Sequence, residues 1–196
     1  MLDPDSLPAT ARAVLEFWFG TGDDYGRAHA KWFRKEAAFD GEIRTRFLDA
    51  VERAARGDFR DWERLPRGCL ALQILLDQFP RNLFRGEARA FAADAEALRI
   101  CRHVMQHGFD RDFLPVERMF VYLPLEHSES LADQDECHRR MLDLQPYPET
   151  ADLHIWAEKH RVIIRRFGRF PHRNAALGRP STPEEIAFLE TPGSSF

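Results

Sequence analysis

Two arginine-bearing segments contain the residue types that bind anions. Residues 79–86 read FPRNLFRG, and residues 167–181 read FGRFPHRNAALGRPS. The planar guanidinium of arginine matches carboxylate and phosphate groups, and proline and glycine fix the turns that carry it. We therefore expect these segments to form a polar centre. Its candidate ligand-binding residues are Asp77, Arg81, Asn82, Arg85, Arg169, His172, Arg173, Asn174 and Arg179.

The same residues also suit a structural role. Asp77 falls in the last turn of a predicted leucine-rich helix over residues 68–79, so its carboxylate could pair with Arg81 or with an arginine of the later segment. Such a pair would join two helix ends, and removing one partner of a buried pair costs about 3–5 kcal/mol. The sequence leaves two interpretations open, an anion site and a set of internal salt bridges.

Residues 126–129, Glu-His-Ser-Glu, are a candidate catalytic motif. Neighbouring carboxylates favour the protonated form of a histidine, which can then serve as an acid, a base or a metal ligand. The same four residues also suit the acidic first turn of a helix, with Ser128 as its cap. Both interpretations of this motif stay open.

His160 is a second candidate for acid/base chemistry. It shares an apolar stripe with Trp156, Ile163 and Phe167, which is typical of a core histidine, but it also precedes the basic segment by only two turns. Neither His127 nor His160 belongs to a His-x-x-x-His or Glu-x-x-His pattern, so we expect no metal, and no other cofactor motif is present. The catalytic candidates are His127, His160, Glu126 and Glu129.

The elements that must position these residues are helices. Apolar residues recur with the helical period along almost the whole chain, and no stretch alternates as a strand does. We predict an all-α fold, an antiparallel bundle of about nine to eleven helices with short connections. Its 196 residues suffice for one well-buried core, so we expect a single domain over residues 1–190 and a loose tail over residues 191–196.

Local signals predict where several helices begin and end. Asp40 and Ser128 are predicted N-caps, because their side chains can accept a hydrogen bond from a first-turn amide. Pro80 is predicted to bend or end the leucine-rich helix, and Pro124 is predicted to break the helix that starts at Leu114-Pro115. Residues 182–185, Thr-Pro-Glu-Glu, have the form of a capping box and predict a short last helix.

Composition favours a cytoplasmic globular protein. Hydrophobic residues make up 44% of the chain, and no apolar run is long enough to cross a bilayer. The acidic start of the chain does not have the layout of a signal peptide. Cys69, Cys101 and Cys137 are an odd number, which favours reduced thiols. Cys69 stands near a predicted helix N-terminus, where a thiol pKa can fall, but it also suits a buried core position.

Charge is unevenly distributed along the chain. Residues 159–179 contain seven Lys or Arg and no acid, whereas residues 119–138 contain five acids and no Lys or Arg. The two segments either face each other within the fold or leave an open, positively charged site. We do not expect nucleic-acid binding, because the net charge is −4, although Phe167 and Phe170 in the basic segment could stack on bases.

Several segments together resemble a known bacterial family. They are VLEFWFG (14–20), LALQILLDQFPRNLFR (70–85), ERMF (117–120), PLEHSE (124–129) and residues 167–179. In combination they resemble the family catalogued as domain of unknown function 924. The resemblance implies an α-α superhelix similar to tetratricopeptide-repeat proteins, and it implies no established activity.

Three hypotheses for function follow. The first is a binding module whose Arg- and His-lined pocket holds an anionic small molecule or a carboxylate-bearing peptide. The alternatives are a hydrolase or transferase that uses His127 or His160 as general acid/base, and a structural scaffold whose polar clusters are internal ion pairs. The sequence does not define the ligand or the oligomeric state.

Overall fold

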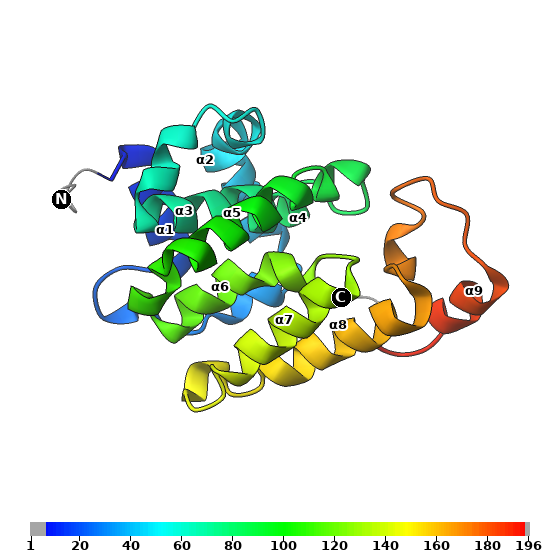
Figure 1. Cartoon of the computed structure of the whole chain (residues 1–196). Helices are drawn as coiled ribbons and strands as arrows, with labels where there is room; N and C mark the ends of the chain where they lie inside the picture. The colour runs from blue at the N-terminus through cyan, green and yellow to red at the C-terminus, as the bar shows by residue number, and fades with distance from the viewer. Residues whose placement is uncertain (1–6, 195–196) are drawn as a thin grey trace.

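The protein is all-helical, as predicted. A computed structural model describes residues 7–194, and in that range it contains no strand. This part of the chain contains nine α-helical stretches, joined by loops, short 3-10 turns and one π turn (Figure 1). They are α1 (Ala9–Phe19), α2 (Ala37–Ala55), α3 (Pro66–Gln73), α4 (Phe79–Leu83), α5 (Asp94–His107), α6 (Pro115–Glu126), α7 (Leu131–Leu142), α8 (Leu153–Phe167) and α9 (Pro183–Leu189).

Aromatic side chains fill the centre of the main core. The ring of Trp18, on α1, lies 5.6 Å from Phe79 and 5.4 Å from Phe120, and Trp32 lies 4.8 Å from Phe120. All three pairs are edge-to-face, which is a favoured aromatic geometry at these distances. The four residues come from α1, α4, α6 and the 3-10 turn Ala30–Phe33, so this packing joins distant parts of the chain.

A second, smaller core attaches the C-terminal segment. Ile163 and Ile164 of α8 pack with Phe170 and form a cluster separate from the main core, with Phe167 and Phe188 against its edge. Figure 1 shows residues 168–194 turning away from the end of α8 and returning through α9, while α6, α7 and α8 lie side by side. The predicted capping box opens α9, where Thr182 Oγ1 accepts a hydrogen bond from the Glu185 amide at 3.2 Å.

The leucine-rich helix does not end at Pro80, where the sequence predicted a bend or an end. The helix passes from α3 through a π turn over Ile74–Gln78 into α4, and Phe79 has helical angles of φ −59° and ψ −38°. The wider turn lets the Phe79 amide donate to the Ile74 carbonyl. A π turn makes room for the proline ring and places the missing N–H where the hydrogen-bond ladder is already interrupted. It also turns Asp77 into the protein interior, at 1% side-chain exposure.

Pro124 likewise lies inside a helix that continues to Glu126, so the predicted break there was wrong. Interior proline costs about 3 kcal/mol. All residues of α6 from Met119 to Glu126 are buried, and this packing offsets the lost bond. Glu126 is therefore the last residue of α6, and residues 127–129 follow it instead of opening the next helix as its acidic first turn.

Both predicted N-caps were wrong. Helix α2 begins at Ala37, which places Asp40 inside its first turn. Ser130, and not Ser128, is the residue before α7. The Ser128 hydroxyl instead donates to Asp133 at 2.7 Å.

Within residues 7–194, no helix is both long enough and apolar enough to cross a lipid bilayer.

Candidate functional site

The π turn and the end of α6 bring Asp77 and His127 together. Oδ1 of Asp77 lies 2.7 Å from Nδ1 of His127, and the ring of His127 is 14% exposed. The same carboxylate lies 3.1 Å from Nη1 of Arg81 and accepts a hydrogen bond from Gln78 at 2.6 Å. The buried negative charge thus has a partner on each side.

Asp94, the first residue of α5, bridges the two arginine-bearing segments. Arg81 donates to both of its carboxylate oxygens, at 3.0 and 3.1 Å. Nη1 of Arg173 donates to Oδ2 of Asp94 at 3.3 Å and to the carbonyl of His127 at 3.0 Å. Segments 79–86 and 167–181 therefore meet beside His127. Asp77, Arg81, Asp94, His127 and Arg173 are called the central cluster below.

The charges of the central cluster are set by burial and by the neighbouring ions. Burial disfavours the charged form of Asp77, but Arg81 and His127 hold its pKa below the usual range. Burial, and then the positive charge of Arg81, lower the pKa of His127. Burial and Arg81 also lower the pKa of Arg173, to about 10. At pH 7 the Asp77–His127 pair thus consists of a charged carboxylate and a neutral imidazole.

His160 and Glu126 form a buried pair behind the central cluster. Nδ1 of His160 lies 2.9 Å from the Trp156 carbonyl and 3.4 Å from Oε1 of Glu126. Burial lowers the pKa of His160 to about 3, and burial followed by the charge of Asp77 raises the pKa of Glu126 to about 8. Both side chains are neutral at pH 7. His160 is thus a core histidine bonded to its own helix, while Trp156, predicted on the same stripe, is exposed.

Asn82 and Arg85 lie apart from the central cluster. The Asn82 amide donates to Asp40 at 2.7 Å, and two nitrogens of Arg85 donate to the same carboxylate at 3.0 Å each. Burial opposes the charge on Asp40, yet these hydrogen bonds keep its pKa below the usual value. The three residues connect α4 to α2.

Arg169 and Asn174 hold the start of α9. Two nitrogens of Arg169 donate to the Glu185 carboxylate at 2.6 and 2.7 Å, and Asn174 donates to it at 3.3 Å. The hydrogen bonds from Arg169 lower the pKa of Glu185 to about 2. Glu185 also completes the capping box of α9, so a single carboxylate fixes both the helix start and the arginine.

Arg179 and Glu129 fasten the C-terminal segment beside the central cluster. Arg179 donates to both carboxylate oxygens of Glu129, at 2.7 and 2.9 Å, and Glu129 also accepts from the Phe170 amide at 2.8 Å. A bidentate arginine–carboxylate pair of this kind is among the stronger ionic contacts. His172, in the same segment, is half-buried, and burial followed by Arg173 lowers its pKa to about 4.

Apart from His172, the structure therefore divides the predicted ligand-binding residues into three groups. Asp77, Arg81 and Arg173 belong to the central cluster, Arg169, Asn174 and Arg179 join the C-terminal segment to acids, and Asn82 and Arg85 bind α2. Each of the five predicted arginines contacts a carboxylate.

Three of these carboxylates were not recognised in the sequence as arginine partners: Asp40, Asp94 and Glu185. Asp94 and Glu185 stand in first turns of helices, where acids are common for local reasons, so nothing in the sequence marks them as long-range partners.

His103 and His107 have the i, i+4 spacing of a metal motif, and sequence reasoning passed over them. Nε2 of His103 lies 3.0 Å from the Glu63 carbonyl and Nδ1 of His107 lies 2.9 Å from the His103 carbonyl, so backbone oxygens engage both rings. Within residues 7–194, no three His, Cys, Asp or Glu side chains are grouped to hold a metal ion.

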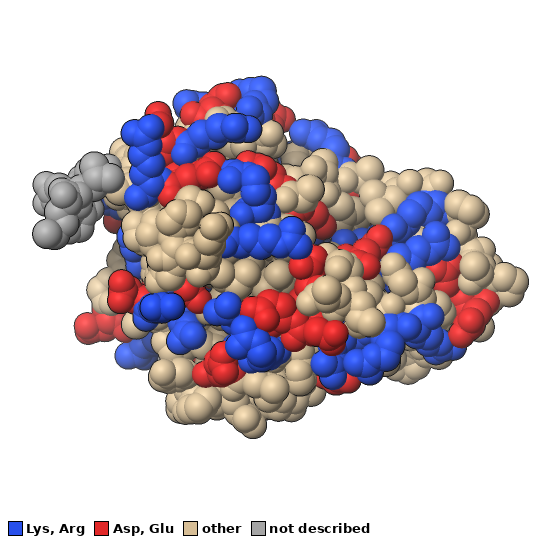
Figure 2. All heavy atoms as spheres, in the orientation of Figure 1, with Lys and Arg blue, Asp and Glu red and all other residues tan. Residues whose placement is uncertain are grey.

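The acidic segment, residues 119–138, and the basic segment, residues 159–179, face each other along part of their length. Figure 2 shows acidic side chains over α7 and basic side chains over the neighbouring α8. Arg161 of α8 lies 3.1 Å from Asp135 of α7. Other basic residues of the segment pair elsewhere, as Arg166 does with Glu184 at 2.9 Å.

The cysteines are buried free thiols. Burial raises the pKa of Cys69 to about 12. Of the two roles left open for Cys69, the structure therefore supports a buried core residue and not a thiol activated by the start of α3.

Fold and site together define an all-α protein with a buried Asp–His–Arg cluster where several helix ends meet. A family model described as bacterial protein of unknown function (DUF924) matches residues 14–193. The protein belongs to this family, which confirms the resemblance seen in its sequence.

A solved structure is also similar. It is that of a protein of unknown function from Agrobacterium tumefaciens, with 42% sequence identity and a TM-score of 0.79 over 93% of this chain and 97% of that one. No curated protein matches the chain.

Proposed function

We propose that the protein is an enzyme of the hydrolase or transferase type in which His127 is the general base. The observation that supports this is the contact between His127 and the buried carboxylate of Asp77. Among the described residues, Nε2 of His127 has no hydrogen-bond partner, and the ring reaches the surface. This is the arrangement of a histidine that is oriented through one nitrogen and reacts through the other.

The chemistry follows from the protonation states. Nδ1–H donates to Asp77, so the lone pair of the neutral ring is on Nε2 and can take a proton from a water or a hydroxyl group of a substrate. The charged carboxylate then stabilises the imidazolium that forms. Arg173, bound to the carbonyl of His127, places positive charge beside the position where negative charge develops.

Among the predicted catalytic residues, His127 is the best placed general base, because the other three are buried or held by hydrogen bonds. His160 is 7% exposed and bonded to its own helix, and Glu126 is buried beside it. Glu129 is held by Arg179 and by the Phe170 amide. Binding of an anionic small molecule or acidic peptide at the central cluster is the alternative proposal. This alternative has weaker support, because an anionic ligand must compete for the arginines with carboxylates that already contact them.

The test is a screen against esters, phosphate esters and amides, followed by comparison of His127→Gln with His160→Gln. We expect His127→Gln to lower kcat/KM by about a hundredfold or more while its melting temperature stays close to that of the wild type. The pH–rate profile should show a basic group with a pKa below 6.5, which His127→Gln removes. An empty screen, or full activity in folded His127→Gln, would favour the third hypothesis, a cluster that only joins helix ends.

A further inference from the structure

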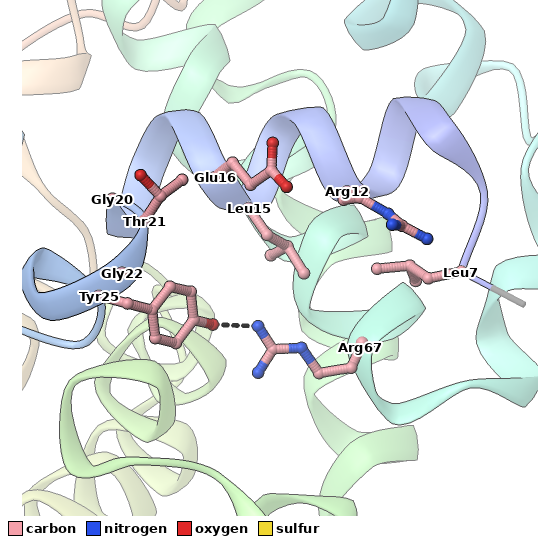
Figure 3. Close-up of a pocket in the computed structure, with 9 residues that line it drawn as sticks. All are labelled: Leu7, Arg12, Leu15, Glu16, Gly20, Thr21, Gly22, Tyr25 and Arg67. Atoms are coloured by element: carbon pink, nitrogen blue, oxygen red, sulfur yellow. Dashed lines mark hydrogen bonds between the residues drawn. The ribbon is translucent and has the colours of Figure 1, made fainter. Parts of the chain in front are cut away.

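A cavity of about 280 Å³ lies beneath α1, lined by residues outside the central cluster. Figure 3 shows its walls, formed by α1, by the turn that follows it and by the start of α3. Leu7 and Leu15 are apolar, whereas Arg12, Thr21, Tyr25 and Arg67 are polar. The volume is close to the lower end of the range for small-molecule sites, which also combine apolar walls with a few polar groups.

Arg67 is held in position from one side. Its Nη1 donates to the buried Glu117 carboxylate at 2.7 Å, and its Nη2 donates to the hydroxyl of Tyr25 (Figure 3). The Tyr25 hydroxyl in turn donates to Glu117. These bonds use two of the five N–H donors of the guanidinium, whose side chain is 40% exposed. A guanidinium fixed along one edge, with donors left over, is preorganised for an anion.

Arg12 supplies a second positive charge. It is exposed on α1, and its guanidinium makes no hydrogen bond or ion pair with any residue in the range 7–194. Figure 3 shows it directed along the cavity side of α1 toward Leu7, above Arg67, whereas the carboxylate of Glu16 is directed away from Arg67. Within residues 7–194, Arg12 has no acidic partner, unlike the paired arginines of the predicted segments.

We propose that this cavity binds a small organic carboxylate with an apolar body. The carboxylate lies against the remaining N–H donors of Arg67, the exposed Arg12 adds a second positive charge to the cavity, and the body lies against Leu7 and Leu15. A carboxylate is favoured over a phosphate because its two oxygens match the planar fork of arginine and because two leucines form the facing wall. The site is independent of the Asp77–His127 pair.

The test uses three probes: benzoate, benzamide and inorganic phosphate. Each is titrated into the full-length protein, and its binding is measured by calorimetry and by amide chemical shifts. Benzoate should bind and shift the amides of Thr21, Gly22 and Arg67, and benzamide, which has the same ring without the charge, should bind more than about tenfold more weakly. Phosphate that binds as tightly as benzoate would overturn the assignment to a carboxylate with an apolar body.

Arg12→Gln is the decisive variant, since Arg12 is exposed and has no ion-pair partner within residues 7–194 whose loss could unfold the protein. We expect it to weaken benzoate binding about fivefold, the effect of one exposed ion pair. Arg165→Gln, which removes an exposed charge from α8, should leave binding unchanged. Arg67→Gln should abolish binding, with melting temperature as the check on folding because Glu117 is left buried. Absence of benzoate binding, or equal binding by wild type and Arg12→Gln, would refute the proposal.

Discussion

Nδ1 of His127 lies 2.7 Å from Oδ1 of Asp77, although fifty positions separate the two residues. The contact exists because a π turn directs Asp77 inward and because α6 continues past Pro124 to its end at Glu126. Arg81 approaches the same carboxylate from the other side at 3.1 Å. The carboxylate therefore fixes both a histidine and an arginine, and its removal leaves a buried guanidinium without one of its partners.

Asp77→Ala should lower the free energy of unfolding by about 3–5 kcal/mol, the cost of removing one member of a buried ion pair. Urea denaturation at pH 7 measures the change. Asp23→Ala, at an exposed position in the turn after α1, is the matched control and should stay within about 0.5 kcal/mol of the wild type. Equal stability of the two variants would show that the buried contacts of Asp77 do not hold the helix ends together.

Glu126 should make stability fall as the pH rises. In the folded protein it keeps its proton up to about pH 8, whereas in the unfolded chain it loses the proton near 4.5. Between these values the folded state binds the extra proton, so this group removes up to ~1.4 kcal/mol of stability for each pH unit of increase. Its contribution is fully present below about pH 4.5 and is lost by about pH 8.

Glu126→Gln should remove this slope, because glutamine does not titrate. The free energy of unfolding of the variant, relative to the wild type, should therefore increase steadily from pH 5 to pH 8. Glu149→Gln, at an exposed position before α8, should keep the wild-type slope. Parallel profiles for Glu126→Gln and the wild type would mean that folded Glu126 is ionised at neutral pH.

Sequence reasoning identified the helical class and the helix boundaries that depend on local chemistry. The Thr182 capping box is an example, since all its partners lie within four residues. It failed at Pro124, where packing of a long buried helix outweighs a local preference, and at Pro80 it did not predict the π turn that carries the helix past the proline. The candidate residues were chosen by type, but the partner of Arg81 and Arg173 is Asp94, and only the folded chain brings these three together.

Glu129→Ala should loosen the C-terminal segment. The change removes both hydrogen bonds from Arg179 and the one from the Phe170 amide, and the remaining apolar contacts of the segment form only a small cluster. We expect trypsin to cleave near Arg166 and Arg169 several times faster than in the wild type, with the fragments identified by mass spectrometry. Glu149→Ala is the control and should be cleaved at the wild-type rate. Unchanged cleavage of Glu129→Ala would show that the apolar cluster alone holds the segment.

Gly68 and Gly41 should respond in opposite directions to the same substitution. Alanine usually stabilises a helix by up to about 1 kcal/mol relative to glycine. Gly41, on α2, has nothing within 4 Å of an added Cβ, so Gly41→Ala should raise the free energy of unfolding by that amount.

At Gly68, on α3, an added Cβ would lie 2.3 Å from the Trp62 carbonyl oxygen, which is backbone and cannot rotate away. Gly68→Ala should therefore lower the free energy of unfolding by about 1–3 kcal/mol, the usual cost of overpacking. Urea titrations of the two variants measure both effects. A stabilised Gly68→Ala protein would mean that the turn carrying Trp62 can move away from α3 at little cost, and that the close packing of these two elements does not limit stability.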